Sequence, residues 1–274
     1  LFAPARGLGQ DRPRKRGPMP NPTPNARAPF LAVLIDADNI PARHAEAILD
    51  EIAAHGEAGL RRVYGDWSSQ ALGQWKEQAR KLGLVMHQQS ANTKGKNASD
   101  IGLVIDAMDI LHAGKVDGFV LVSSDSDFTR LASRIREDGL QVIGVGAAKT
   151  PEALRKVCNR FLLLENIAGA DDPPAPEAAE PREAAPGRAE PAARLEKLPP
   201  ERALPLILAA MKHIDPDQDW YSLGPLGQTL TQLHPDFDAR SYGAPKFSDL
   251  LRKLPMRFEV KKGPNNALMV RDKA

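Results

Sequence analysis

Between residues 30 and 167 the sequence alternates short apolar runs with longer segments whose apolar residues recur at helical spacing. The runs are continuous, as in strands that are covered on both faces, rather than alternating apolar with polar. Because a helix between two strands lets the chain re-enter the sheet in the same direction, this order predicts a parallel sheet. We therefore expect a three-layer α/β domain. The expected strands lie at 31–36, 61–67, 84–89, 119–124, 141–146 and 161–166, and the expected helices at 41–55, 69–82, 98–113, 127–138 and 150–158.

The expected helix at 98–113 has an apolar stripe of its own. The stripe consists of Ile101, Val104, Ile105, Met108 and Leu111. This spacing predicts that the stripe faces the core. Asp106 and Asp109 lie roughly opposite Asp100 on the helical wheel, so we expect them in solvent.

Composition changes on both sides of this body. Residues 1–29 hold seven prolines and six Arg or Lys against one Asp, which predicts a disordered basic arm. The arm is either a solubilising tail or an electrostatic contact for nucleic acid. Residues 168–202 hold eight prolines and ten alanines, which predicts an extended linker. The chain thus divides into an arm (1–29), a body (30–167), a linker (168–202) and a tail domain (203–274).

The composition argues against several classes of protein. A transmembrane helix needs a run of about 18 apolar residues, and no such run occurs, so we expect no membrane partner. The first residues lack the compact apolar segment of a signal peptide, which favours a cytoplasmic protein. The single cysteine, Cys158, excludes an internal disulfide and a cysteine-based zinc site. Its apolar surroundings predict a buried thiol.

Carboxylates follow several predicted strands at the point where each strand ends. Asp36 and Asp38 follow the first strand, Asp66 follows the second, and Asp125 and Asp127 follow the fourth. The carboxyl ends of parallel strands meet at one edge of a sheet, where ligands bind near the reversal of strand order. We therefore expect these acids to converge.

Asp100, in the segment NASD, begins the expected helix at 98–113 and joins this group. Acids gathered at one edge repel one another and favour a cation, and Mg²⁺ and Mn²⁺ prefer oxygen ligands. Such an ion can activate water and stabilise the leaving oxygen of a phosphodiester. The sequence therefore predicts a metal site for phosphodiester chemistry.

Each acid also has a structural interpretation. Asp36 can end a strand, Asp100 can complement a helix dipole, and Asp125 or Asp127 can cap the following helix. We favour a functional role for Asp36, Asp100 and Asp125, and we treat Asp127 as a ligand or as the neighbour of one. For Asp66 both interpretations stay open.

Two lysines, Lys94 and Lys96, precede Asp100 in a polar loop. They either neutralise substrate phosphates beside the metal or belong to a solvated loop. The loop is not a phosphate-binding P-loop, because the G-x-x-x-x-G-K-[ST] pattern is absent.

Four segments of the body together resemble the NYN domain, a branch of the PIN-like nucleases: LAVLIDADNIP, VYGDW, KGKNASDIGLVIDAMDIL and SSDSDFTRLASRIREDGLQVIGVG. The resemblance covers about residues 30–167 and implies a PIN-like fold that binds Mg²⁺ or Mn²⁺ and cleaves RNA. It implies that Asp36, Asp100 and Asp125 are metal ligands and catalytic residues, with Asp127 as a further catalytic residue. Asn39, Asp66 and Ser124 are expected to support the site.

The tail domain has the pattern of a winged helix: a helix at 203–214, two further helices, and two short strands about a Gly-Pro-Asn-Asn turn. The segment DFDARSYGAPKFSDLLRKL, followed by RFEV, resembles the LOTUS domain, also called OST-HTH. This resemblance implies binding of RNA or, in some relatives, of protein. Candidate phosphate contacts are Lys246, Arg252, Lys253, Lys261 and Lys262. Trp220, Tyr221, Phe237, Tyr242 and Phe247 are expected in the core rather than as base-stacking platforms.

The sequence therefore predicts a metal-dependent endoribonuclease that is targeted by an RNA-binding tail domain. The first alternative is a non-catalytic RNA-binding adaptor whose acidic pocket serves structure, a metal or a partner. The second is a phosphatase-type enzyme with Asp36 as its nucleophile, because Asp36-Ala37-Asp38 has the D-x-D pattern. An adaptor would cleave no RNA with or without Mn²⁺, and a phosphatase would leave an aspartyl-phosphate on Asp36 and release phosphate from small esters.

Overall fold

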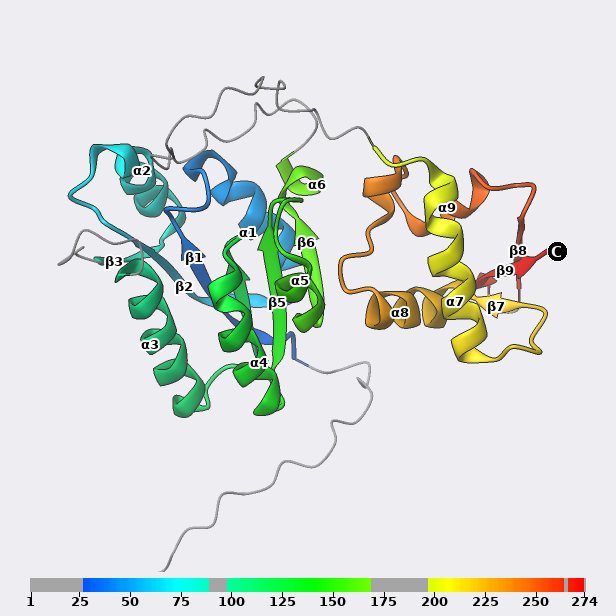
Figure 1. Cartoon of the computed structure of the whole chain (residues 1–274), viewed down its shortest axis with the longest axis horizontal. Helices are drawn as coiled ribbons and strands as arrows, with labels where there is room; N and C mark the ends of the chain where they lie inside the picture. Colours follow the sequence, from blue (N-terminus) through cyan, green and yellow to red (C-terminus); the bar gives the residue numbers. More distant parts are fainter. Residues whose placement is uncertain (1–26, 89–97, 169–196, 264–265, 274) are drawn as a thin grey trace, which may run out of the picture.

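The computed structural model describes residues 27–88, 98–168, 197–263 and 266–273. The first folded unit is built on a parallel sheet with the strand order β3-β2-β1-β4-β5-β6 (Figure 1). Its strands are β1 (Phe30–Asp36), β2 (Glu57–Gly65), β3 (Val85–Gln88), β4 (Gly118–Val122), β5 (Gln141–Gly146) and β6 (Arg160–Leu163). The predicted α/β class and the parallel sheet are therefore confirmed.

Helices cover both faces of this sheet. On one face α1, α2 and α6 contribute Ile48, Trp75 and Leu164 to a core that includes alternate residues of β1. On the other face α3 and α4 contribute Leu103 and Leu131 to a second core. The two faces give the unit its three layers. The helices are α1 (Ala45–Ala53), α2 (Gly73–Leu82), α3 (Ala98–Ala113), α4 (Thr129–Glu137), α5 (Glu152–Val157) and α6 (Leu164–Ala168).

The strand order reverses between β1 and β4. The chain builds β1, β2 and β3 outward in one direction, and then crosses back to place β4 on the other side of β1. The connections leaving the carboxyl ends of β1 and β4 therefore diverge, which leaves room for a ligand between them. This reversal places the ends of β1 and β4 next to each other.

Two apolar runs differ from the predicted strands. The run at 61–67 belongs to a longer strand that begins at Glu57, because residues at both ends of β2 pair with β1. The run at 161–166 is split: β6 ends at Leu163, and α6 begins at Leu164. Neither difference changes the order of the elements.

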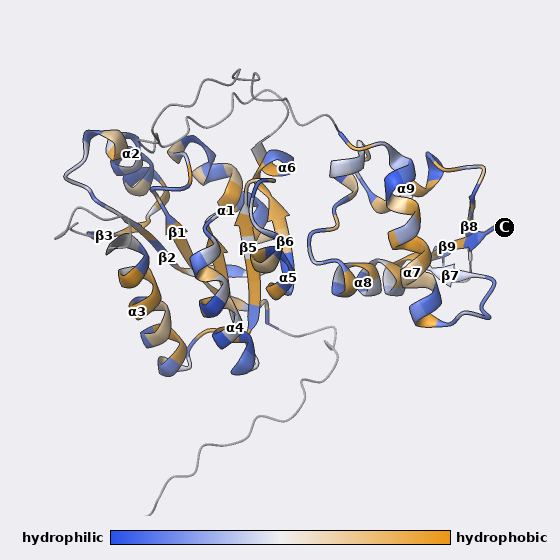
Figure 2. Cartoon of the chain, in the orientation of Figure 1, coloured by the Kyte–Doolittle hydropathy of each residue, from blue (hydrophilic) through white to orange (hydrophobic). Residues whose placement is uncertain are grey.

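The helix α3 buries only part of the stripe that its sequence predicts: Leu111 is buried, and Val104 and Met108 pack against the core. Ile101 and Ile105 are 59% and 58% exposed, so the prediction that they face the core is wrong. The buried side chains are Leu103, Ala107, Ile110 and Leu111. Apolar residues lie on several sides of α3, as its colouring in Figure 2 shows, and spacing alone therefore did not identify the side that packs.

The orientation of α3 in the structure also turns Asp106 toward β2 and away from solvent. Its carboxylate accepts hydrogen bonds from the Arg62 guanidinium and the Tyr64 hydroxyl, both on β2. The prediction of a solvated Asp106 is therefore wrong. Asp109, by contrast, is exposed as predicted.

The second folded unit contains three α-helices and a small antiparallel sheet with the order β7-β9-β8. Helix and hairpin agree with the winged-helix pattern, and the short strand β7 adds a third member to the sheet. Ile207, Leu226 and Leu250, one from each helix, are completely buried in its core. The elements are α7 (Leu204–Ile214), β7 (Tyr221–Ser222), α8 (Leu223–Leu233), α9 (Phe247–Arg252), β8 (Phe258–Lys262) and β9 (Leu268–Asp272).

Most of the predicted arm, at residues 1–26, and of the predicted linker, at 169–196, lies outside the described residues. Over the ranges that are described, no helix is both long enough and apolar enough to cross a membrane.

Candidate metal centre

The carboxylate of Asp36 lies at the carboxyl end of β1 and is only 2% exposed. Its Oδ1 accepts the backbone N–H of Asp38 at 3.1 Å. Its Oδ2 accepts the Asn39 amide at 2.6 Å and the Ser123 hydroxyl at 2.9 Å. The Ser123 hydroxyl comes from the end of β4, so this hydrogen bond joins the two strands on either side of the reversal. Ser123 is not among the site residues that the sequence predicted, although a serine directly after a buried strand was a usable signal.

The segment after β4 supplies two further carboxylates. Asp125 accepts the backbone N–H of Asp127 at 2.9 Å and so caps a short 3-10 helix, Ser126–Phe128. The backbone N–H of Asp125 donates to the Ser123 hydroxyl at 3.1 Å. Asp125 is half-buried and Asp127 is exposed. Capping and ligand binding are compatible here, because the cap uses one carboxylate oxygen of Asp125 and leaves the other.

Asp100, in the first turn of α3, completes the group. One carboxylate oxygen from each of Asp100, Asp125 and Asp127 lies within 4.8 Å of the other two. Asp36 is not part of this group of three, although sequence analysis named it as a ligand together with Asp100 and Asp125. Asp36 is buried and is close enough for its negative charge to raise the pKa of Asp100.

The protonation of these acids follows from their surroundings. Burial raises the pKa of Asp36, and the hydrogen bonds from Asn39 and Ser123 oppose this rise. Burial also raises the pKa of Asp100 from 3.8 to about 6, with further contributions from the negative charges of Asp36, Asp125 and Asp127. Carboxylates that are half-buried together are costly when charged, and a bound cation would remove that cost.

The arrangement fits a divalent cation. Mg²⁺ binds oxygen at about 2.0–2.1 Å, so oxygens on opposite sides of one ion lie about 4 Å apart. Neighbouring oxygens on such an ion lie about 3 Å apart. The three carboxylate oxygens are within 4.8 Å of one another, so small side-chain rotations would let all three bind one ion. All the donors are oxygens, which suits Mg²⁺ or Mn²⁺ better than softer metals.

The remaining predicted site residues lie around this group or outside it. Asn39 holds Asp36, as described above. The Ser124 hydroxyl accepts the backbone N–H of Ala147 at 2.9 Å and so ties the end of β4 to the segment after β5. Asp66 accepts hydrogen bonds from Ser68 and Gln88, which lower its pKa, and it does not join the group of three. Lys94 and Lys96 lie outside the described residues.

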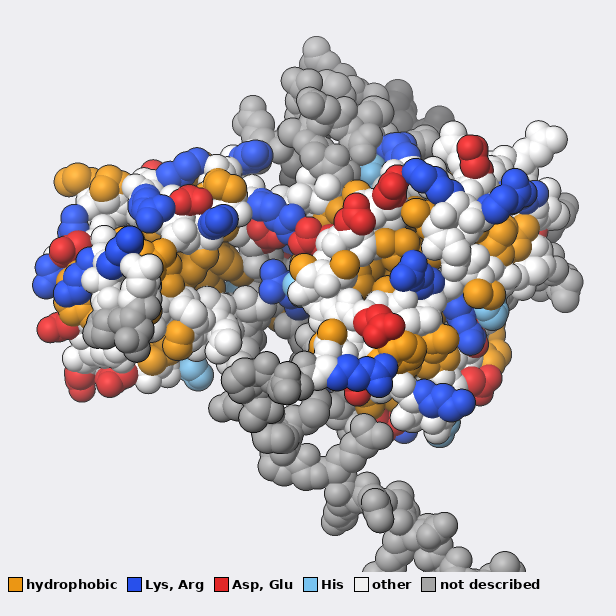
Figure 3. All heavy atoms as spheres, turned by 180° about the vertical axis from the view of Figure 1, so that it is seen from behind, with side chains coloured by type: hydrophobic (Ala, Val, Ile, Leu, Met, Phe, Trp, Pro, Cys, Tyr) orange, Lys and Arg blue, Asp and Glu red, His pale blue; other side chains and the backbone are white. Residues whose placement is uncertain are grey.

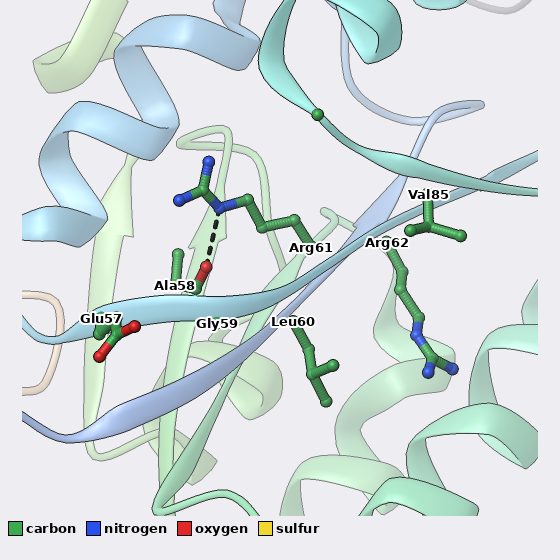
Figure 4. A pocket seen from close by; sticks show the side chains of 8 residues that line it. Glu57, Ala58, Gly59, Leu60, Arg61, Arg62 and Val85 are labelled. Atoms are coloured by element: carbon green, nitrogen blue, oxygen red, sulfur yellow. Dashed lines mark hydrogen bonds between the residues drawn. The ribbon is translucent and has the colours of Figure 1, made fainter.

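A hollow of about 410 Å³ lies elsewhere, along the first half of β2 and the start of β3. In it the Arg61 guanidinium turns back to the Ala58 carbonyl, at 2.7 Å (Figure 4). Because these residues precede the carboxyl ends of the strands, the hollow is separate from the acidic group. Its lining is Glu57, Ala58, Gly59, Leu60, Arg61, Arg62, Gly83 and Val85.

Two family models match the chain. The model described as the NYN domain matches residues 30–165, and the model described as the OST-HTH/LOTUS domain matches residues 200–270. The chain therefore contains an NYN domain followed by an OST-HTH/LOTUS domain. The NYN domain belongs to the PIN-like nuclease superfamily, and the LOTUS domain is an RNA-binding domain.

Two solved structures are similar to parts of the chain. A crystal structure of a protein of unknown function from Vibrio parahaemolyticus has 20% identity and a TM-score of 0.42, covering 52% of this chain and 96% of that one. A solution NMR structure of an uncharacterised protein from Nitrosomonas europaea has 30% identity and a TM-score of 0.24, covering 36% of this chain and 92% of that one. No curated protein matches the chain significantly.

The candidate phosphate contacts of the LOTUS domain are all exposed. Three of them make contacts within their own domain: Arg252 pairs with Asp249, Lys253 donates to the Gly243 carbonyl, and Lys261 lies over the Trp220 ring. Figure 3 shows Lys and Arg side chains spread over the visible face of this domain. The five candidates are Lys246, Arg252, Lys253, Lys261 and Lys262.

Four of the five aromatic residues expected in the LOTUS core contribute to it. Tyr221 and Tyr242 are buried, and Phe237 and Phe247 pack against the core from its edge. Trp220 differs, because its ring carries Lys261 Nζ at 3.5 Å and the Arg271 guanidinium at 4.9 Å from the ring centre.

Proposed function

We propose that the chain is a divalent-metal-dependent endoribonuclease, in which the NYN domain cleaves RNA phosphodiesters and the LOTUS domain binds the RNA. The observation that carries this proposal is the group of three carboxylates at the reversal of strand order. This group lies in the NYN domain, which belongs to a nuclease superfamily, and at the same edge of the sheet as the buried Asp36.

In this proposal Asp100, Asp125 and Asp127 hold Mg²⁺ or Mn²⁺ through carboxylate oxygens. A divalent ion at this place supplies a Lewis acid for the hydrolysis of a phosphodiester. Asp36 adds negative charge close to Asp100 and joins the ends of β1 and β4 through Ser123. Lys94 and Lys96 precede Asp100 in the chain and are proposed to contact substrate phosphates.

The test is cleavage of a labelled RNA by the full chain. We expect cleavage with Mn²⁺ or Mg²⁺, its loss in EDTA, and its return when Mn²⁺ is added in excess. Asp125→Asn and Asp100→Asn should each reduce cleavage by at least about a hundredfold, since either change removes a negatively charged ligand of the cation that would stabilise the transition state. Asp109→Asn is the matched control for Asp100→Asn, because Asp109 is exposed on the same helix.

The adaptor alternative gives a different result. An adaptor binds RNA with the same affinity in all four proteins and cleaves it in none, with or without metal. The phosphatase alternative is disfavoured by burial, because the Asp36 carboxylate is 2% exposed and both its oxygens accept hydrogen bonds. A nucleophilic carboxylate needs a free oxygen that can reach the phosphorus atom of the substrate.

A further inference from the structure

One short segment of the LOTUS domain makes several hydrogen bonds and ion pairs with the NYN domain. It comprises residues 235–241, between α8 and α9, and we call it the docking segment. In Figure 1 this part of the chain lies beside β6, and acidic and basic side chains adjoin where the two domains meet in Figure 3. The segment reaches four elements of the NYN domain, which are α1, α5, β6 and α6.

The first contact is between backbones. The N–H of Phe161, on β6, donates to the carbonyl of Pro235 at 2.8 Å. Pro235 is buried although it lies in a surface loop of its own domain. Because β6 ends the order of the sheet, its outward backbone groups would otherwise be available to another chain. The docking segment covers one of them.

Two ion pairs flank this contact. The Arg240 guanidinium makes two hydrogen bonds to the carboxylate of Glu51, at 2.7 and 3.0 Å. Arg155 of α5 donates to Asp236 at 3.0 Å. All four side chains are partly buried, so water screens these pairs less than it screens pairs on an open surface. A bidentate arginine–carboxylate pair also restricts orientation as well as distance.

Arg240 is positioned by its own domain before it meets Glu51. Its backbone N–H and its side chain both donate to Asp238, whose side chain is 10% exposed. The hydrogen bonds that Arg240 donates to the carboxylates of Asp238 and Glu51 raise the pKa of its guanidinium. The guanidinium is therefore held in place, and less entropy is lost when it binds Glu51.

A last contact lies at the other end of the segment. The Asn166 amide, on α6, donates to the Ser241 hydroxyl at 2.8 Å. Asn166 follows β6, whereas Glu51 lies near the end of α1, just before the chain enters β2. The contacts therefore involve α1, α5, β6 and α6, and contacts spread over four elements oppose rotation of one domain on the other.

We infer that residues 235–241 dock the LOTUS domain onto the β6 edge of the NYN domain and hold it in one orientation. The linker is then not the only connection between the domains. The docked edge is separated from β4, and so from the acidic group, by β5. Docking therefore leaves the carboxyl ends of β1 and β4 uncovered by the docking segment.

The inference is tested on the intact chain without RNA by ¹⁵N NMR relaxation, which gives a rotational correlation time for each domain. A docked chain tumbles as one body, so the amides of both domains should give the same time. The variant Arg155→Asp with Arg240→Glu places like charges at both ion pairs. We expect two different times in this variant, with the shorter one in the LOTUS domain.

Two controls make the result specific. Lys76→Glu with Lys212→Glu makes the same change of charge, one substitution on each domain, at exposed positions of α2 and α7 outside the docking segment, and should keep a single time. Arg155→Asp combined with Asp236→Arg restores one pair with its charges exchanged, and should also keep a single time. Dispersed amide spectra of both domains show that each variant is folded.

Two different times in the unmodified chain would overturn the inference, as would a single time in the variant with like charges. Both measurements are independent of RNA cleavage. The proposed nuclease activity can therefore be refuted while the docking is confirmed, and the docking can be refuted while the activity is confirmed.

Discussion

Asp100 faces several other carboxylates, and its negative charge therefore opposes folding when no cation is bound. Its pKa in the folded chain is about 6, against 3.8 for an ordinary aspartate. Between these values the folded chain keeps a proton that the unfolded chain releases. The contribution of Asp100 to the free energy of unfolding therefore decreases as the pH rises through this interval.

The substitution Asp100→Asn should remove this penalty. In metal-free buffer at about pH 7.5 we expect the variant to melt at a higher temperature than the unmodified chain, and at about pH 4 the two should melt alike. Added Mn²⁺ should then stabilise the unmodified chain more than the variant. Thermal melting followed by circular dichroism checks this, and a lower melting temperature for the variant at both pH values would contradict it.

Ser123 is predicted to matter more than its neighbour Ser124 for the metal centre. Ser123→Ala removes a donor to the buried Asp36 and an acceptor for the Asp125 N–H, and should cost about 1–3 kcal/mol of stability. It should also weaken Mn²⁺ binding, which calorimetry measures. Ser124→Ala removes only the acceptor of the Ala147 N–H, so its Mn²⁺ affinity should be unchanged. Equal affinities in both variants would contradict the role of Ser123.

Among the elements, α3 offers the clearest test of packing. Leu103 is 2% exposed, whereas Ile105, two residues later, is 58% exposed. Leu103→Ala should therefore destabilise the chain by about 2–5 kcal/mol, because it leaves a cavity in the core. Ile105→Ala should change the stability by less than about 0.5 kcal/mol. Urea unfolding measures both, and the reverse order would restore the stripe that the sequence predicts.

The sequence predicted the strands of the sheet better than the faces of its helices. Residues 31–36 read as a strand because they are apolar on both sides of the pleat, and burial on both faces leaves only one interpretation. Helix α3 has apolar residues on more than one side, so its period is compatible with several orientations. Only the packing against β1 and β2 selects Leu103 over Ile101.

The same limit applies to the acids. That Asp36 and Asp125 would meet at one edge follows from the parallel sheet, and this was predictable. That Asp127 lies within 4.8 Å of Asp100 and Asp125, in a group without Asp36, depends on side-chain directions after β1 and β4. Asp36 turns into the protein because Asn39 and Ser123 bind it there, and such hydrogen bonds leave no periodic pattern in a sequence.

At the scale of the whole molecule, the two domains carry net charges of opposite sign. The body at 30–167 has 16 basic and 18 acidic residues, and the tail at 203–274 has ten basic and eight acidic ones. RNA binding by the full chain should therefore depend on salt through the LOTUS domain. Lys246→Ala and Lys262→Ala should each reduce the slope of log K against log salt by about 0.7–0.9, if each lysine neutralises one phosphate.

Lys76→Ala is the control, because this lysine is exposed on α2 of the NYN domain. Fluorescence anisotropy at several salt concentrations gives the slopes. An unchanged slope in both LOTUS variants would indicate that this domain binds a protein instead, as the alternative for the tail domain proposed. The docking of the two domains was not predictable, since Glu51 and Arg240 are two charged residues among many in a single sequence.

Cys158, the only cysteine of the chain, is 1% exposed, and burial raises the pKa of its thiol to about 12. Thiol reagents attack the thiolate, so this side chain stays almost unreactive in the folded protein near neutral pH. Thiol-specific labels would therefore not attach to the folded, unmodified chain. A cysteine introduced on each domain would accept a fluorophore or a spin label without first replacing Cys158, and the distance between the two labels would then report directly on how the domains are held.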